Sequence, residues 1–151
     1  MTKELKIWLD DEQQIVTRVQ SLGGSYKGES TSIHTYFNQP EGQVLKLVET
    51  NGRVTLDTLQ RKGEQFIMVS QEPIVDSSTL SQELTNKHGI KTKLIMHAKS
   101  YQLEDYEVSL YDIENVGKFL ILTGDNPTVA LLDKWFEMSS PKLVTASFDN
   151  L

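Results

Sequence analysis

Apolar and polar residues alternate along several short segments of the chain, and this period of two is typical of half-buried β-strands. Near the start, Leu5, Ile7 and Leu9 fall on one face of the expected strand. Glu4 and Lys6 fall on the opposite face. The other segments with strand character are residues 34–37, 44–49, 53–60, 66–72, 92–101, 106–112 and 119–123. The pattern predicts an antiparallel sheet of about eight strands.

Residues 34–49 give the clearest pair of strands, with a turn that contains a proline and a glycine. In the second strand of the pair, Leu45 and Leu47 face one side of the sheet. Lys46 lies between them and faces the other side. The pair therefore points one basic side chain into whatever this second face encloses.

Three further segments carry apolar residues at the spacing of an amphipathic helix. Each begins at a residue that can cap a helix N-terminus and ends at glycines or at serines followed by a proline. The expected helices run from Asp10 or Asp11 to Gly23, from Asp76 to Gly89, and from Asn126, with Pro127 as the first helical residue, to Ser139.

These elements predict an α+β fold with residues 1–151 as a single domain. The sheet is expected to curve into an antiparallel tunnel or open barrel, with the helices packed outside it. The outer face is then the apolar one, which carries pairs such as Leu45 with Leu47 and Leu120 with Leu122. The polar residues of the opposite face line the interior.

Composition limits the possible functions. Asp and Glu number 21 against 15 for Lys and Arg, and the net charge of −6 argues against a nucleic-acid or membrane partner. The chain has no cysteine, which excludes disulfides and thiolate chemistry. It also lacks a Gly-rich phosphate loop, a nucleophile elbow and zinc spacing. Because no signal-peptide pattern is present, we expect a cytoplasmic protein.

Several segments resemble the CYTH family of class IV adenylate cyclases, thiamine triphosphatases and inorganic triphosphatases. Residues 34–37 (His-Thr-Tyr-Phe) and 45–49 (Leu-Lys-Leu-Val-Glu) are similar to that family's Asp-x-Tyr-Phe and Leu-Arg-Leu-Arg-Glu. Residues 117–119 (Gly-Lys-Phe) and the ending 147–151 (Ser-Phe-Asp-Asn-Leu) resemble two further family segments. The resemblance implies a tunnel that binds a triphosphate together with Mg²⁺ or Mn²⁺.

The same resemblance identifies positions for the metal ligands, and only two of them carry a carboxylate here, Glu4 and Glu72. The others are replaced by Thr2, Tyr111, Ile121 and Thr123. A hard divalent cation prefers several oxygen ligands, so two separated carboxylates form a poor cage for it. We therefore expect no confident cofactor, and Mg²⁺ or Mn²⁺ only if an enzymatic function holds.

Four basic residues are candidates for binding an anionic ligand: Lys6, Lys46, Lys99 and His97. Lys6 and Lys46 are expected to converge on one interior site. For Lys99 and His97 the alignment stays open, because a slip of one residue would turn Met96 and Ala98 inward in their place. Expected cations are replaced by Val48, Gln60 and Met68.

The leading hypothesis is a divergent CYTH-like binding module, without catalysis or only weakly active, that takes a small phosphorylated or anionic ligand. One alternative is a metal-dependent adenylate cyclase or triphosphatase acting on ATP or another triphosphate. A second alternative is a protein-interaction subunit with a plugged tunnel. The pattern is compatible with a monomer or a homodimer.

Overall fold

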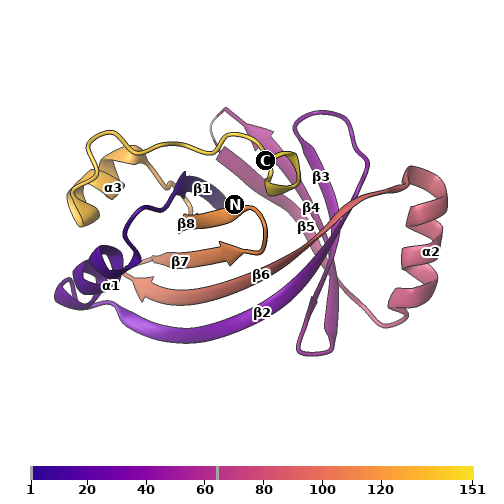
Figure 1. The fold of residues 1–151 in the computed structure, drawn as a ribbon, viewed down its shortest axis with the longest axis horizontal. Helices are drawn as coiled ribbons and strands as arrows, with labels where there is room; N and C mark the ends of the chain where they lie inside the picture. The colour runs from indigo at the N-terminus through magenta and orange to yellow at the C-terminus, as the bar shows by residue number, and fades with distance from the viewer. Residues whose placement is uncertain (1, 64) are drawn as a thin grey trace.

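The structure is a computed structural model that describes residues 2–63 and 65–151. Within these residues, eight antiparallel strands close into one barrel in the order β1-β5-β4-β3-β2-β6-β7-β8 (Figure 1). The strands are β1 (Lys3–Trp8), β2 (Ser25–Phe37), β3 (Gln43–Thr50), β4 (Arg53–Lys62), β5 (Gln65–Ile74), β6 (Ile90–Leu103), β7 (Tyr106–Ile113) and β8 (Gly117–Gly124). The predicted α+β fold is confirmed, with a closed barrel.

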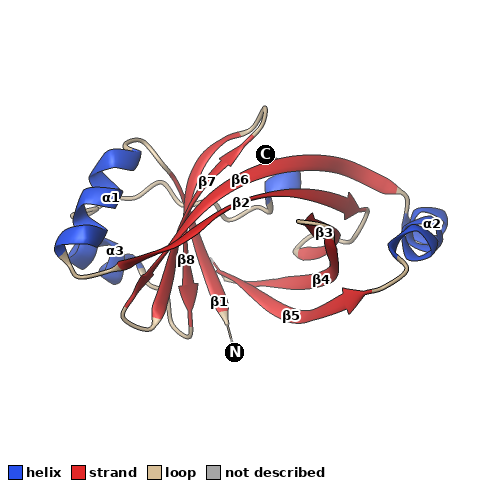
Figure 2. Cartoon of the chain, turned by 90° about the horizontal axis from the view of Figure 1, so that it is seen from below, coloured by secondary structure: helices blue, strands red, loops and turns tan. Residues whose placement is uncertain are grey.

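The helices are α1 (Glu12–Ser21), α2 (Ser77–His88) and α3 (Val129–Phe136), and a 3₁₀ turn, η1, covers Phe148–Asn150. Helices α1 and α3 lie at one end of the molecule and α2 at the other (Figure 2). None of the described helices is long and apolar enough to cross a bilayer.

The outer core lies between α1, α3 and the apolar face of the neighbouring strands. Leu5 and Ile7 of β1 and Leu120 and Leu122 of β8 are almost fully buried there. The helices contribute Ile15, Val19, Leu132, Trp135 and Phe136. The prediction that these leucines face outward, under helices, is confirmed.

The helix N-termini follow the predicted caps in two cases. The Asp11 side chain accepts from the Gln14 backbone N–H at 3.2 Å, and the Asp76 side chain accepts from the Thr79 N–H at 3.1 Å. The cap predicted at Asn126 is wrong.

The third helix begins two residues later, where the Thr128 hydroxyl accepts from the Leu131 N–H at 3.2 Å. Pro127 keeps the residue before it extended, and its own carbonyl accepts from the Gln65 side chain, so the helix begins only after Thr128.

Strands β2 and β6 are longer than the alternation predicts, and they cross the whole molecule side by side (Figure 1). The first half of β2, from Ser25, is mostly polar and exposed, so it carries no alternating signal. Pairing with β6 over Ser25–Phe37 holds it in the sheet. Backbone hydrogen bonds, which leave no mark in the side-chain pattern, extend the strand.

Candidate functional site

The barrel encloses a small cavity of about 50 Å³ that is lined by charged and aromatic side chains. Its polar lining comes from Glu4, Lys6, His34, Tyr36, Lys46 and Ser147. Apolar and aromatic side chains complete the wall: Val44, Leu59, Phe66, Met96, Tyr111, Ile121 and Phe148. The period of two brings Lys6 of β1 and Lys46 of β3 to this one cavity.

Lys6 is 5% exposed, and its ammonium group contacts one carbonyl and two aromatic rings. Nζ donates to the Ala146 carbonyl at 3.1 Å and lies over the rings of Phe66 and Phe148, 4.2 and 4.4 Å from their centroids. Burial lowers the pKa of Lys6 to about 8, and the charge of Lys46 adds to this effect. The Lys6 ammonium is therefore a desolvated cation close to its titration range.

Lys46 lies directly across from Asp57 in the β3–β4 pairing. Its Nζ is 3.5 Å from the Tyr36 hydroxyl oxygen and 5.2 Å from the centre of that ring. Burial lowers the pKa of Lys46, while the charges of Glu4, Asp57 and Asp149 act in the opposite direction. The two interior lysines thus share a cavity in which water supplies little solvation.

His34 is buried on the inner face of β2 and is only partly satisfied. Its Nε2 lies 2.8 Å from the Ser32 hydroxyl, whereas its Nδ1 has no hydrogen-bond partner among the described residues. Burial, with a contribution from Lys46, lowers the pKa of His34 to about 2, so the ring is neutral. A buried ring nitrogen without a partner is costly, and it marks a place for a water or ligand atom.

Two interior carboxylates were missed by the sequence analysis. Asp57 is 5% exposed and accepts from the Thr55 hydroxyl at 2.8 Å and from the Gln71 amide at 3.4 Å. Asp149 comes from the C-terminal tail and affects the pKa of both lysines. Alternation from Leu59 back along β4 could have identified Asp57, but no pattern indicates the path of the tail.

Glu72 does not reach the cavity, contrary to the prediction. In the β4–β5 pairing Leu59 is opposite Met68 but Thr58 is opposite Ser70, so a β-bulge forms at Val69. Beyond the bulge the faces are exchanged: both residues are exposed, but it is the Gln71 amide, not Glu72, that reaches Asp57. Of the two predicted metal ligands, only Glu4 lines the interior.

His97 and Lys99 lie on the outer face of β6. His97 contacts the Thr31 hydroxyl at 2.9 Å and the Glu114 carboxylate at 2.8 Å, and both residues are exposed. Lys99 pairs with Glu12 of α1 at 3.7 Å. The alignment that the sequence left open is therefore the strict one, in which Met96 lines the cavity and His97 and Lys99 do not.

The donor set does not fit a divalent metal ion. Tyr111 and Ile121 line the cavity where the resemblance places carboxylates, and Thr2 and Thr123 lie by a different pocket. Within residues 2–63 and 65–151, no group of three or more His, Asp or Glu side chains is placed to hold a metal. The cavity offers ammonium groups and aromatic rings instead.

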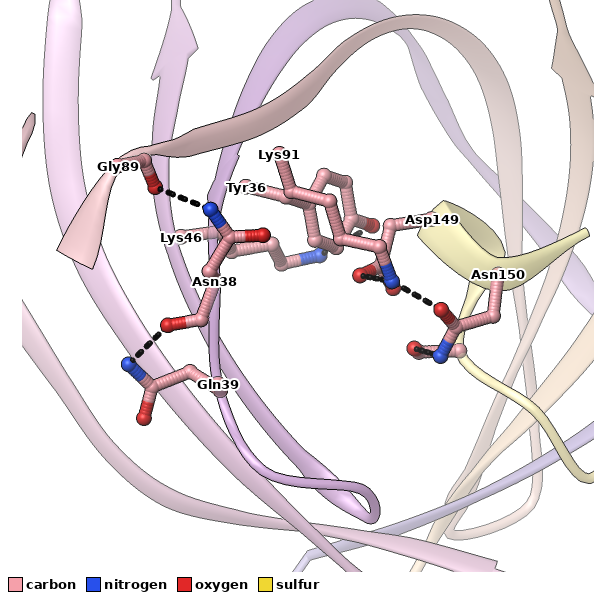
Figure 3. A network of polar contacts seen from close by, with 9 residues as sticks. Tyr36, Asn38, Gln39, Lys46, Gly89, Lys91, Asp149 and Asn150 are labelled. Atoms are coloured by element: carbon pink, nitrogen blue, oxygen red, sulfur yellow. Dashed lines mark hydrogen bonds and ion pairs between the residues drawn. The ribbon is translucent and has the colours of Figure 1, made fainter.

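The C-terminal tail reaches the cavity through Ser147 and Phe148. It first pairs with β1, where the Val144 N–H donates to the Lys6 carbonyl at 2.8 Å. Phe148 then packs in the barrel with its ring centre 4.7 Å from that of Phe119. Asp149 forms an ion pair with Lys91 of β6 at 3.0 Å, and Lys91 also contacts Asn150 (Figure 3).

A second cavity of about 420 Å³ lies on the other side of the tail. Arg61 and Lys91 supply its basic side chains. Its remaining lining is Phe37, Gln39, Pro40, Glu41, Gly42, Gln43, Phe66, Ala146, Ser147, Asp149 and Asn150. Because Phe66 and Ser147 border both cavities, the tail separates an inner from an outer chamber of one barrel.

Neither a family model nor a curated protein sequence matches the chain. Solved structures do match it. PH1012 of Pyrococcus horikoshii aligns at 13% identity and a TM-score of 0.86, covering 100% of this chain and 99% of that one.

Two enzymes or proposed enzymes share the fold. A proposed adenylate cyclase from Vibrio parahaemolyticus aligns at 13% identity and a TM-score of 0.67, over 90% of this chain and 82% of that one. HpAC1 from Hippeastrum, a proposed adenylyl cyclase with dominant triphosphatase activity, aligns at 13% identity and a TM-score of 0.65, over 97% and 92%. At these identities the likeness establishes the fold alone: the chain has the tunnel fold of adenylate cyclase-like and triphosphatase proteins.

Proposed function

We propose that this protein is a divergent CYTH-like module that binds a small phosphorylated or anionic ligand inside the barrel, without a metal ion. One observation carries the proposal: Lys6 and Lys46 converge on a single buried cavity beside a neutral His34, whose Nδ1 has no partner among the described residues. Two desolvated ammonium groups attract a phosphate strongly, because water does not screen them.

Among the described residues, the interior carboxylates are dispersed rather than clustered as a metal site requires. The cations Lys6, Lys46 and Lys91 face the carboxylates of Glu4, Asp57 and Asp149. Asp57 already accepts two hydrogen bonds from neutral side chains. This arrangement lacks the clustered carboxylates that a Mg²⁺-dependent reaction requires, and so we propose binding rather than catalysis.

Calorimetry with pyrophosphate and ATP, with and without EDTA, tests the proposal. We expect binding that survives EDTA and weakens at least about tenfold in Lys46→Ala, because a charged hydrogen bond contributes about 1.5–3 kcal/mol. Lys99→Ala is the matched control, since that lysine lies on the outer face of the same barrel. Affinity should also fall as pH rises above about 8, where Lys6 loses its proton.

Two results would contradict this function. Turnover of ATP, thiamine triphosphate or tripolyphosphate with Mg²⁺ or Mn²⁺, abolished by Glu4→Gln, would establish the enzymatic alternative. Absence of binding at millimolar ligand, in this protein and in variants with a loosened tail, would leave the protein-interaction alternative. The inner cavity of about 50 Å³ admits no triphosphate while the tail is in place, and this favours that alternative over catalysis.

A further inference from the structure

We propose that the C-terminal tail, residues 145–151, is an internal occupant of the ligand site, and that an incoming anion expels it. In the closed state the Asp149 carboxylate takes the place of the anion. This inference rests on the proposed function, because it assumes that Lys6 and Lys46 bind an anion. It adds that the empty protein is held closed by its own chain.

The tail is anchored by one aromatic side chain. Phe148 is 6% exposed and packs against Phe119 and Tyr111, with ring centres 4.7 and 6.4 Å apart. Ile121 belongs to the same buried cluster. Tyr111 and Ile121 occupy positions where the family resemblance places carboxylates. These two residues therefore form part of the surface against which the tail packs.

Electrostatics makes the tail a substitute for a ligand. Asp149 pairs with Lys91, and its charge also opposes the lowering of the pKa values of Lys6 and Lys46 that burial causes. The Lys6 ammonium meanwhile donates to the Ala146 carbonyl of the tail. The closed barrel is therefore charge-balanced, and removal of Asp149 leaves one cation in excess for an incoming anion.

The Asp149 carboxylate is only partly satisfied, so a better acceptor can displace it. Its Oδ1 is buried without a hydrogen-bond partner among the described residues. A phosphate carries more acceptor oxygens and more charge than one carboxylate, so it can satisfy Lys91 together with the interior lysines. The tail and the ligand thus compete for the same lysines, and the ligand binds them better.

The space inside the barrel requires the same conclusion. Small-ligand sites usually occupy about 300–1,000 Å³, whereas the inner chamber holds about 50 Å³. Residues 146–150 form the wall between it and the outer chamber of about 420 Å³. Withdrawal of the tail joins the two chambers into one site that reaches from Arg61 and Lys91 to the inner lysines.

The tail can leave without unfolding the barrel. Its backbone pairing with β1 ends at Val144. The next carbonyl, that of Thr145, accepts only a long hydrogen bond of 3.5 Å from the Arg61 side chain. Residues 148–150 form a single 3₁₀ turn. The barrel strands are paired around the full circle without it.

Affinity measurements on two variants test whether the tail competes. Phe148→Ala removes the anchor without changing charge, and Asp149→Asn removes the competing carboxylate. We expect each to bind pyrophosphate about 10-fold more tightly than the unaltered protein, within the usual range of coupling between sites. Asp133→Asn on the exposed face of α3 is the charge-matched control and should leave the affinity unchanged.

A thiol probe tests whether the tail moves. The chain has no cysteine, so Ser147→Cys introduces one reactive group at a position that is 7% exposed in the closed state. We expect saturating pyrophosphate to speed its reaction with an aromatic disulfide about 10-fold. Ser109→Cys on β7, 5% exposed and away from the tail, reports opening of the barrel itself and should not respond.

The outcomes separate this inference from the proposed function. Tighter binding in Phe148→Ala with faster labelling of the Ser147→Cys thiol supports expulsion. Binding of pyrophosphate that leaves both the labelling rate and the variant affinities unchanged overturns it, while the proposed function stands. If neither the unaltered protein nor Phe148→Ala binds any anion, the proposed function itself fails.

Discussion

The barrel has two cores that differ in what their residues are suited for. The outer core, between the sheet and helices α1 and α3, consists of aliphatic and aromatic side chains with no charge. The inner core mixes Phe119, Phe148 and Met96 with the charged groups of Lys6 and Lys46. Burial of charge lowers stability, whereas burial of leucine raises it, so the outer core stabilises the fold and the inner core serves binding.

The largest effect that tests this contrast is loss of a side chain from the outer core. Leu120→Ala should lower the free energy of unfolding by about 3 kcal/mol, because the residue is fully buried and leaves a cavity. Urea denaturation measures the change. Anion affinity should stay unaltered in the folded fraction, and a large loss of affinity would mean that the two cores are not separable.

Inside the barrel, replacing a charged side chain is expected to raise the free energy of unfolding. Lys6→Met should raise the free energy of unfolding at pH 7 by about 2 kcal/mol. Lowering a pKa from 10.5 to about 8 costs about 3 kcal/mol, and the Ala146 carbonyl, left without its donor, returns about 1 kcal/mol of that. The same variant should lose anion binding.

The pH dependence of stability also tests the cost of burying the charged Lys6. Between pH 8 and 10.5 the unfolded chain still holds the Lys6 proton while the folded protein has lost it, so stability should rise with pH in that window. The rise should be smaller in Lys6→Met, where Lys46, whose pKa burial also lowers, still contributes to it. Denaturation midpoints measured at pH 7, 8, 9 and about 10 compare the two proteins; a variant less stable than the parent at every pH would refute the contrast.

His34 tests the same contrast in acid. Its pKa is about 2 in the folded protein and 6.5 in the unfolded chain, so its contribution is complete above 6.5 and is lost as pH falls. The expected slope is about 1.4 kcal/mol per pH unit below 6.5. Thermal unfolding of His34→Gln, which cannot titrate, should show a shallower acid slope, and equal slopes would contradict a neutral buried ring.

The sequence predicted those parts of the structure that burial alone decides. Only one orientation of the strands around Leu5 and Leu120 buries their leucines, and it places them under the helices. The same orientation places Lys6 on the opposite face. Lys46 followed for the same reason. The ligand-binding role of either lysine stays a prediction.

The remaining site residues depended on features that leave no periodic signal. A single β-bulge at Val69 brought the Gln71 amide, and not Glu72, to Asp57. On β6 both faces carry residues that could line a cavity, so the sequence did not decide between His97 and Met96. Asp149 reaches the interior through an irregular tail, whose path is set by the seat for Phe148.

Helix α2 has a consequence for how the molecule fluctuates. It connects β5 to β6, strands that are not neighbours in the barrel, and none of its residues is buried. A helix of 12 residues with no fully buried side chain is marginal in water. Its amide protons should therefore exchange with solvent through local opening, while the strands on either side stay protected. The segment between β5 and β6 then serves mainly to span the distance between these strands, and this depends more on its length than on its helical order.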